Sequence, residues 1–168
     1  MDSTIERYSG LDVLVNNAAM KETGTIETTS LEQYDRVFDI NVRAVYHLTM
    51  LAVPHLIKSK GKIVNVSSVN ALRSFSGSLA YNMSKAAIHH FTSCVALELA
   101  SKCVRVNSIS PGVIVTELQK RGGLDEKAYA EFLAETKISH ALGRPGQPEE
   151  VAKAIAFLAS EESSFTTG

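Results

Sequence analysis

Short apolar runs alternate along the chain with longer segments of helical periodicity. Three of these runs, residues 11–15, 62–66 and 104–109, predict buried strands. These runs are rich in Val, Ile and Leu and are interpreted as apolar runs instead of strictly alternating ones, which is typical of strands in a parallel sheet covered on both faces. The pattern therefore favours an α/β fold.

Helices are expected between and around these strands. A helix tail over residues 3–8 is closed by Gly10. Ser30 and Gln33 form a capping-box pattern that opens a long helix over residues 31–58. Pro54 lies inside that segment, so we expect it to bend the helix or to end its first part.

Three further helices follow in the second half of the chain. Residues 80–101 carry apolar positions on more than one face, which predicts a buried helix. Residues 125–136 predict a moderate helix in a polar insert. Pro148 suits the first position of a last helix, which has an apolar stripe at Val151, Ile155 and Leu158.

The order of elements predicts a partial Rossmann-like, doubly wound parallel sheet with helices on both faces. In such sheets ligands bind beyond the carboxyl ends of the strands. The residues that follow the three strands, 16–19, 67–68 and 110–112, should therefore line one crevice.

Composition narrows the class of protein. The 168 residues have a formal net charge of -1, and no apolar run approaches the length of a membrane span, so neither nucleic acid nor a membrane is expected as a partner. Cys94 and Cys103 have no metal or CxxC spacing and are interpreted as small buried hydrophobes in a reducing compartment. The five histidines suggest no metal site. Without a visible signal segment, the expected location is the cytoplasm.

The local feature that most strongly suggests catalysis is the pair Tyr81 and Lys85, which lie four residues apart on a predicted helix. Residues at this spacing face the same way. A nearby ammonium group favours the phenolate, so we expect Lys85 to lower the pKa of Tyr81 and make it a proton donor and acceptor. The alternative is a solvated pair on a helix surface.

Polar residues near the strand ends add to this pair. Ser68 ends the second strand and could bind a carbonyl oxygen beside Tyr81, or it could be an ordinary turn serine. Asn41 is a poor helix former inside a predicted helix, which suggests a local kink or a bound water, the alternative being an exposed side chain. The small residues Ala18 and Ala19 after Asn16 would let a ligand approach the backbone, unless they form a simple turn.

Together these motifs resemble the short-chain dehydrogenase/reductase family. Residues 16–19 are similar to its Asn-Asn-Ala-Gly signature, with Ala19 in place of the glycine. Residues 41–44 resemble its asparagine segment, Ser68 precedes Tyr81 by the family's thirteen residues, and Tyr81 with Lys85 matches its defining pair. Residues 105–116 and 143–152 resemble the strand and turn beneath the nicotinamide and the opening of the last helix.

The resemblance implies hydride transfer between a nicotinamide cofactor and a carbonyl or secondary alcohol. Tyr81 would be the acid or base, and Lys85 would hold the nicotinamide ribose. Ser68 would polarise the carbonyl, and Asn41 would hold a relay water. The implied cofactor-binding residues are Asn16, Ala18, Ala19, Tyr81, Lys85, Pro111, Gly112, Ile114 and Thr116. Residues 116–141 resemble a substrate lid whose moving tip is residues 121–123.

The family's Gly-rich phosphate-binding turn does not occur in this sequence, and residues 11–15 align with the family's fourth strand. We therefore expect residues 1–168 to form a single incomplete catalytic domain, truncated at the N-terminus and slightly at the C-terminus, with an unpaired edge at residues 11–15. The cofactor is expected to be NAD or NADP, because the discriminating segment is absent.

The predicted function is that of an oxidoreductase fragment acting on a small carbonyl or alcohol. The alternative is a non-catalytic binding or oligomer-assembly partner, because helices 31–58 and 80–101 correspond to those that build the family's dimers and tetramers. A homodimer or homotetramer of the parent protein is expected through them. A related epimerase or dehydratase is a third possibility, although residues 30–43 and 111–116 look more like the simple reductases.

Overall fold

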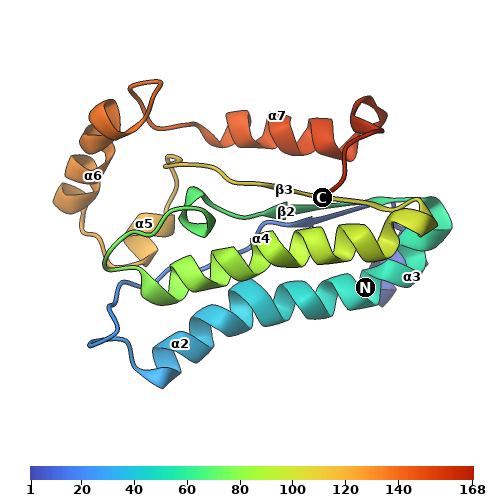
Figure 1. Ribbon diagram of the computed structural model, residues 1–168, viewed down its shortest axis with the longest axis horizontal. Helices are drawn as coiled ribbons and strands as arrows, with labels where there is room; N and C mark the ends of the chain where they lie inside the picture. Colours follow the sequence, from blue (N-terminus) through green and yellow to red (C-terminus); the bar gives the residue numbers. More distant parts are fainter.

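A three-stranded parallel sheet forms the middle layer of the computed structural model, which describes residues 1–168 (Figure 1). Its strands are β1 (Val13–Asn16), β2 (Lys62–Val66) and β3 (Arg105–Ile109), in the order β1-β2-β3. The parallel register sets Asn16 beside Asn65 and Asn65 beside Ser108. The carboxyl ends of all three strands therefore lie at one edge of the sheet.

Helices cover both faces of this sheet, which confirms the predicted partial Rossmann-like α/β fold. The α-helices are α1 (Asp2–Tyr8), α2 (Leu31–Phe38), α3 (Ala44–Ser59), α4 (Leu79–Leu99), α5 (Leu118–Arg121), α6 (Glu126–Ser139) and α7 (Pro148–Ala159). Helices α3 and α4 lie on one side of the sheet and α7 on the other (Figure 1). Helices α5 and α6 lie beyond the carboxyl ends of the strands.

The main hydrophobic core lies between the sheet and helices α3 and α4. Its members are buried aliphatic side chains from the sheet layer and from the layer formed by α3 and α4: Leu14, Ala52, Leu56, Ile63, Ala96, Leu99, Val104 and Val106. Burial of such side chains is the dominant favourable contribution to folding. This core fixes α4 against β2 and β3 and thereby sets the position of the residues at its N-terminal end.

The long helix predicted over residues 31–58 is divided at a different place from the one expected. A π-helical turn at Asp39–Arg43 separates α2 from α3, and it contains the buried Asn41. Asn41 thus marks a local irregularity of the helix in the form of a π-helical turn. Pro54, in contrast, lies inside α3 without ending it. Pro54 and Met50 are both exposed, so the Met50 carbonyl that loses its partner lies on the solvent side of the helix.

Two local predictions were wrong. The left-handed residue that ends α1 is Ser9, with φ 59°, and not Gly10. Cys94 and Cys103 are exposed instead of buried. Cys103 adopts φ 58° after the 3₁₀ turn Ala100–Lys102, a turn position that leaves its side chain at the surface. The 3₁₀ turns Val69–Ala71 and Glu161–Ser163 complete the regular structure.

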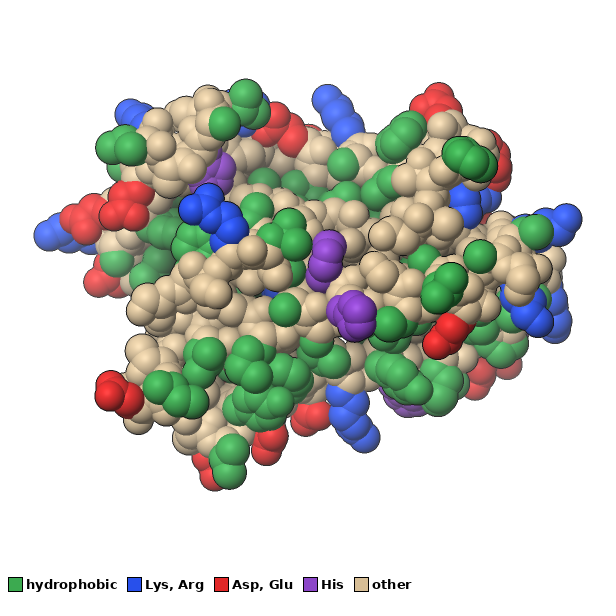
Figure 2. Space-filling model, in the orientation of Figure 1, with side chains coloured by type: hydrophobic (Ala, Val, Ile, Leu, Met, Phe, Trp, Pro, Cys, Tyr) green, Lys and Arg blue, Asp and Glu red, His purple; other side chains and the backbone are tan.

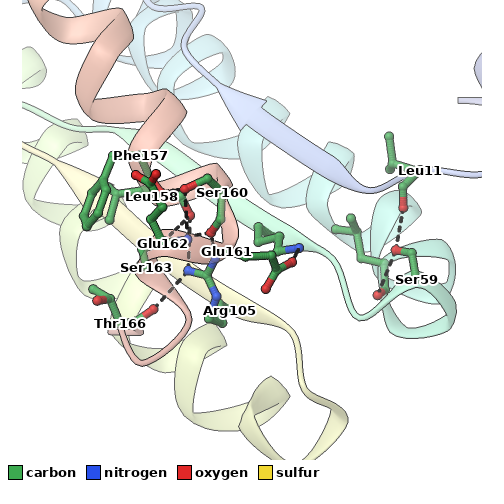
Figure 3. A network of polar contacts seen from close by, with 12 residues as sticks. Leu11, Ser59, Arg105, Phe157, Leu158, Ser160, Glu161, Glu162, Ser163 and Thr166 are labelled. Atoms are coloured by element: carbon green, nitrogen blue, oxygen red, sulfur yellow. Dashed lines mark hydrogen bonds and ion pairs between the residues drawn. The ribbon is translucent and has the colours of Figure 1, made fainter.

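Arg105, at the start of β3, ties the last residues of the chain to the sheet (Figure 3). Its guanidinium donates hydrogen bonds to the carbonyls of Leu158 at 3.1 Å, Ser160 at 2.7 Å and Thr166 at 3.2 Å. The first two carbonyls belong to the C-terminal end of α7, where unpaired carbonyls need donors. The Gly168 N–H also donates to the Val106 carbonyl at 2.9 Å, so the final residues run beside β3.

Candidate active site

The polar residues predicted to meet do so at the carboxyl edge of the sheet. The Ser67 N–H donates to the Ile109 carbonyl at 2.8 Å, and the Val69 N–H donates to the Pro111 carbonyl at 3.0 Å. The segments that follow β2 and β3 are therefore joined by backbone hydrogen bonds. The N-terminal end of α4 and helices α5 and α6 lie at the same end of the molecule (Figure 1).

Tyr81 and Lys85 lie on the first two turns of α4 and are 6% and 3% exposed. The Lys85 Nζ is 5.7 Å from the centroid of the Tyr81 ring. It also donates a hydrogen bond to the Val66 carbonyl at 2.8 Å, at the end of β2. The Ser67 Oγ in turn donates to the Lys85 carbonyl at 3.1 Å. The pair is therefore a buried, anchored arrangement and not a solvated pair on a helix surface.

Burial controls the titration of both groups. It raises the pKa of the Tyr81 phenol above its ordinary value of 10.0, while the polar Ser68 side chain acts in the opposite direction. Burial also lowers the pKa of the Lys85 ammonium from 10.5 to about 8. The expectation of a lowered Tyr81 pKa was wrong for the protein in this state, because desolvation penalises the phenolate more than the nearby groups favour it. Tyr81 is therefore a neutral phenol that can donate a proton.

Ser68 lies beside this pair and is 7% exposed. Its Oγ accepts a hydrogen bond from the Asn70 N–H at 3.1 Å and donates one to the Asn70 Oδ1 at 3.2 Å. The Asn70 Nδ2 donates to the Asn82 Oδ1 at 2.6 Å, which links this turn to α4. A hydroxyl has one hydrogen, so Ser68 must release Asn70 before it can donate to a carbonyl oxygen.

Asn41 connects the site to two further segments and is 1% exposed, so the alternative of an exposed side chain was wrong. Its Oδ1 accepts from the Met20 N–H and its Nδ2 donates to the Met20 carbonyl, both at 2.9 Å. The same Nδ2 donates to the Ser84 Oγ at 2.9 Å, and Ser84 donates to the Tyr81 carbonyl at 2.8 Å. Asn41 thus holds the loop after β1 against the turn of α4 that carries Tyr81.

Asn16 turns its side chain into the protein. Its Nδ2 donates to the Asn65 Oδ1 at 2.8 Å and to the Thr49 Oγ1 at 3.3 Å. The Asn65 Nδ2 donates to the Thr92 Oγ1 at 2.9 Å. This buried chain of polar groups joins α3, β1, β2 and α4 below the site. Ala18 is exposed and Ala19 half-buried, so these two positions remain available to a ligand.

The segment after β3 is held by the region predicted as a lid. The Val113 N–H donates to the Nε2 of His140 at 2.9 Å, and a Cβ on Gly112 would lie 2.6 Å from the same nitrogen. Ile114 pairs with Gly146 in an isolated parallel bridge. The Thr116 carbonyl accepts a hydrogen bond from the Tyr129 hydroxyl of α6 at 3.0 Å. Pro111 is half-buried beside them.

Sequence reasoning missed two residues at this end of the sheet. The Lys21 Nζ lies 5.8 Å from the centroid of the Tyr81 ring, and His140 packs on Gly112. Lys21 is separated from Tyr81 by sixty residues, and His140 from Gly112 by twenty-eight. No local spacing indicates either contact, because both depend on how loops fold over the strand ends.

The donor set at Lys85 fits a nicotinamide ribose. The ammonium has three hydrogen-bond donors, and the Val66 carbonyl accepts one of them. Two donors remain free for ribose hydroxyls next to the Tyr81 hydroxyl. A buried cation whose donors are only partly used is a costly arrangement, and a polar ligand would relieve that cost.

Comparisons with known proteins agree with this geometry. A family profile described as Enoyl-(Acyl carrier protein) reductase matches residues 1–168. The 3-oxoacyl-(acyl-carrier-protein) reductase of Thermotoga maritima is 41% identical over 170 residues, which cover all of this chain and 66% of that protein. Cyclopentanol dehydrogenase of Comamonas testosteroni is 41% identical over 169 residues, with the same two shares covered. The chain therefore spans about two thirds of the length of these relatives.

Solved structures give the same result. The ligand-free aldohexose dehydrogenase of Thermoplasma acidophilum superposes with a TM-score of 0.90 at 36% identity, covering 99% of this chain and 67% of that one. The 3-ketoacyl-(acyl-carrier-protein) reductase of Brucella melitensis complexed with NADH gives 0.87 at 29% identity, covering 99% and 66%. None of the helices has the length and apolar character needed to cross a membrane. By sequence and by structure, this chain belongs to the short-chain dehydrogenase/reductase family.

Proposed function

We propose that the chain carries the catalytic half of an NAD(P)-dependent oxidoreductase that interconverts a carbonyl and a secondary alcohol. The observation that supports this most is the buried Tyr81 phenol with Ser68 and the Lys85 ammonium beside it. These three groups supply a proton donor, a hydrogen bond to a carbonyl oxygen and a positive charge. The relatives named above are reductases and dehydrogenases, which supports the same reaction class.

In carbonyl reduction Tyr81 would donate its phenolic proton to the substrate oxygen as negative charge develops there. The Ser68 hydroxyl would leave Asn70 and hydrogen-bond the same oxygen. When bound, the nicotinamide supplies or accepts the hydride. Lys85 would stabilise the phenolate left after proton transfer, because opposite charges attract strongly where water is excluded.

Asn41 would act by positioning in this scheme. It fixes the loop after β1 through both backbone groups of Met20 and fixes α4 through Ser84. Both Nδ2 hydrogens are used by these contacts, and one lone pair of Oδ1 stays open. A relay water at Asn41 would therefore have to bind that open lone pair or the neighbouring backbone.

The test begins with the 168-residue chain titrated with NADH and NADPH while nicotinamide fluorescence is followed. Saturable binding would mean that the chain holds the cofactor without the family's Gly-rich turn, and turnover of small ketones is then assayed. Tyr81→Phe should lower turnover by about 100-fold or more and leave cofactor binding nearly unchanged, because the transferable proton is lost while the ring and the Lys85 ammonium remain. Tyr46→Phe is the matched control, since Tyr46 is 60% exposed. Equal turnover by Tyr81→Phe and the unaltered chain would refute the role of Tyr81.

A second candidate function, assembly with other subunits, is favoured by one surface. Figure 2 shows hydrophobic side chains gathered over α2 and α3. The exposed apolar residues of this run are Leu31, Ile40, Tyr46, Leu48, Met50 and Leu51. Contiguous apolar patches of this kind mark interaction sites. Sedimentation velocity of the chain and of a Tyr46→Ser/Met50→Ser variant tests it: a dimer or tetramer that the variant loses supports assembly, and a monomer in both contradicts it.

A further inference from the structure

Two ammonium groups lie close to the ring of Tyr81. The Lys85 Nζ is 5.7 Å and the Lys21 Nζ is 5.8 Å from the ring centroid. Lys85 comes from the same helix as Tyr81, but Lys21 comes from the loop after β1. The proposed proton donor thus lies next to one cation that the proposed reaction uses and next to a second cation that it does not use.

The charge of Lys21 has no carboxylate partner. None of the ion pairs in the structure involves Lys21 or Lys85. The adjacent Glu22 is held by Arg36 at 3.0 and 2.8 Å. The one hydrogen-bond acceptor of Lys21 is the neutral Oε1 of Gln119, at 2.9 Å.

The Lys21 side chain is half-buried, and this burial lowers the pKa of its ammonium from the ordinary value of 10.5. A partly desolvated cation is costly unless an anion accompanies it. An anionic ligand group placed here would remove that cost and would meet little competition from solvent.

The position of Lys21 is fixed from both sides. Asn41 binds both backbone groups of the preceding residue, Met20, at 2.9 Å. On the other side, a Cβ on Gly122 would lie 3.0 Å from the Lys21 carbonyl, so the segment after α5 packs directly on this backbone. Gln119, the partner of the ammonium, belongs to α5 itself. Lys21 is therefore held between the catalytic helix and the lid.

We propose that Lys21 is a specificity-determining residue that binds a carboxylate carried by the substrate, so that the preferred substrates are small oxo acids or hydroxy acids. The proposal rests on the function proposed above and names the substrate class of that same site. With the substrate oxygen at Tyr81 and Ser68, a carboxylate on a short carbon chain would extend toward the Lys21 ammonium, which lies 5.8 Å from the centroid of the Tyr81 ring. Lys21 has three donors, so it can bind the carboxylate and keep Gln119, which links substrate charge to the lid.

Binding is measured by calorimetry on the 168-residue chain with three pairs of probes: pyruvate, acetoacetate and 4-oxopentanoate, each against its methyl ester. The esters keep the ketone and lose the charge. We expect at least one acid to bind more tightly than its ester. Lys21→Met should weaken the binding of that acid by about tenfold or more and leave the binding of its ester unchanged, as expected for a charge-assisted contact. Lys21→Arg, which keeps the charge, should restore part of the affinity.

Lys58→Met is the matched control, because Lys58 is exposed and has no ion pair. It should bind every probe like the unaltered chain. The preference for the acid should also fall with added salt, although less steeply than for an exposed pair. Acids and esters that bind equally, or an acid preference that survives Lys21→Met, would overturn the proposal.

Turnover separates this proposal from the one on which it rests. If neutral ketones are reduced with full dependence on Tyr81 and the acids have no advantage, the oxidoreductase function stands and the role of Lys21 fails. If the acids bind in a Lys21-dependent manner without any turnover, the anion site stands and the proposed reaction fails.

Discussion

Replacing Asn65 by alanine should destabilise the chain strongly, because the Asn65 side chain is fully buried and hydrogen-bonded. Asn65 is 0% exposed and stands in the middle strand. Its side chain accepts a hydrogen bond from Asn16 at 2.8 Å and donates one to Thr92 at 2.9 Å. The substitution removes both bonds and leaves a buried donor on Asn16 without its better acceptor.

The magnitude follows from these contacts. An orphaned buried donor costs about 1–3 kcal/mol, and the second lost hydrogen bond costs about 1 kcal/mol. The free energy of unfolding should therefore fall by about 2–4 kcal/mol. That is a large part of the roughly 5–15 kcal/mol that stabilises an ordinary domain.

Urea unfolding followed by far-UV circular dichroism measures this change. Asn17→Ala is the matched control, because Asn17 is the exposed neighbour of Asn16 and should shift the free energy of unfolding by no more than about 0.5 kcal/mol. The Asn16→Ala/Asn65→Ala double variant should lose less stability than the sum of the single variants, because it removes both partners of one bond. A loss below about 0.5 kcal/mol for Asn65→Ala would refute the reasoning.

Three further outcomes are expected. Arg105→Met removes the donors to three carbonyls, so hydrogen exchange should speed up at residues 166–168 and the melting temperature should fall; unchanged exchange would contradict the anchoring role. Burial lowers the pKa of Lys85 from 10.5 to about 8 in the folded chain, so between these pH values the unfolded chain binds more protons, and the free energy of unfolding should rise with pH from 8 to 10. In urea titrations at several pH values, Lys85→Met should flatten that rise. An identical slope for the variant and the unaltered chain would argue against burial of the charge. Gly112→Ala places a Cβ 2.6 Å from the His140 Nε2, so the His140 ring signals should shift in NMR spectra, whereas unshifted signals would count against the contact.

The sequence alone determined the three strands, most of the helices and the order in which they follow one another, but not the short helix α5 or the π-helical turn between α2 and α3. Short runs rich in Val, Ile and Leu indicated strands covered on both faces, and all three strands are present within a few residues of the predicted ranges. Signals for the start of a helix were reliable, unlike the Gly10 signal for the end of α1: the Ser30 side chain accepts from the Gln33 N–H at 3.2 Å, and α7 begins at Pro148. Such signals act within one turn of helix, so they do not depend on the rest of the chain.

In the candidate active site, too, contacts within one helix could be predicted and contacts between distant segments could not. Tyr81 and Lys85 could be paired from sequence because a helix brings residues four apart to one face. The titration of Tyr81 could not be predicted, because it depends on how deeply the packed layers bury the phenol. A local kink or a bound water was suggested by the polar Asn41 in a predicted helix, but the π-helical turn and the partners Met20 and Ser84, which lie on other segments, were not.

The placement of Lys21 was decided entirely by tertiary structure. Nothing in residues 16–22 distinguishes this lysine from an ordinary loop cation. It reaches Tyr81 because parallel strands bring the loop after β1 and the first turns of α4 to one edge of the sheet, where Asn41 fixes the one against the other. The local sequence determines which functional groups each segment carries. Long-range packing determines which segments come into contact, because contacts between distant residues depend on the whole core and not on any one stretch of chain.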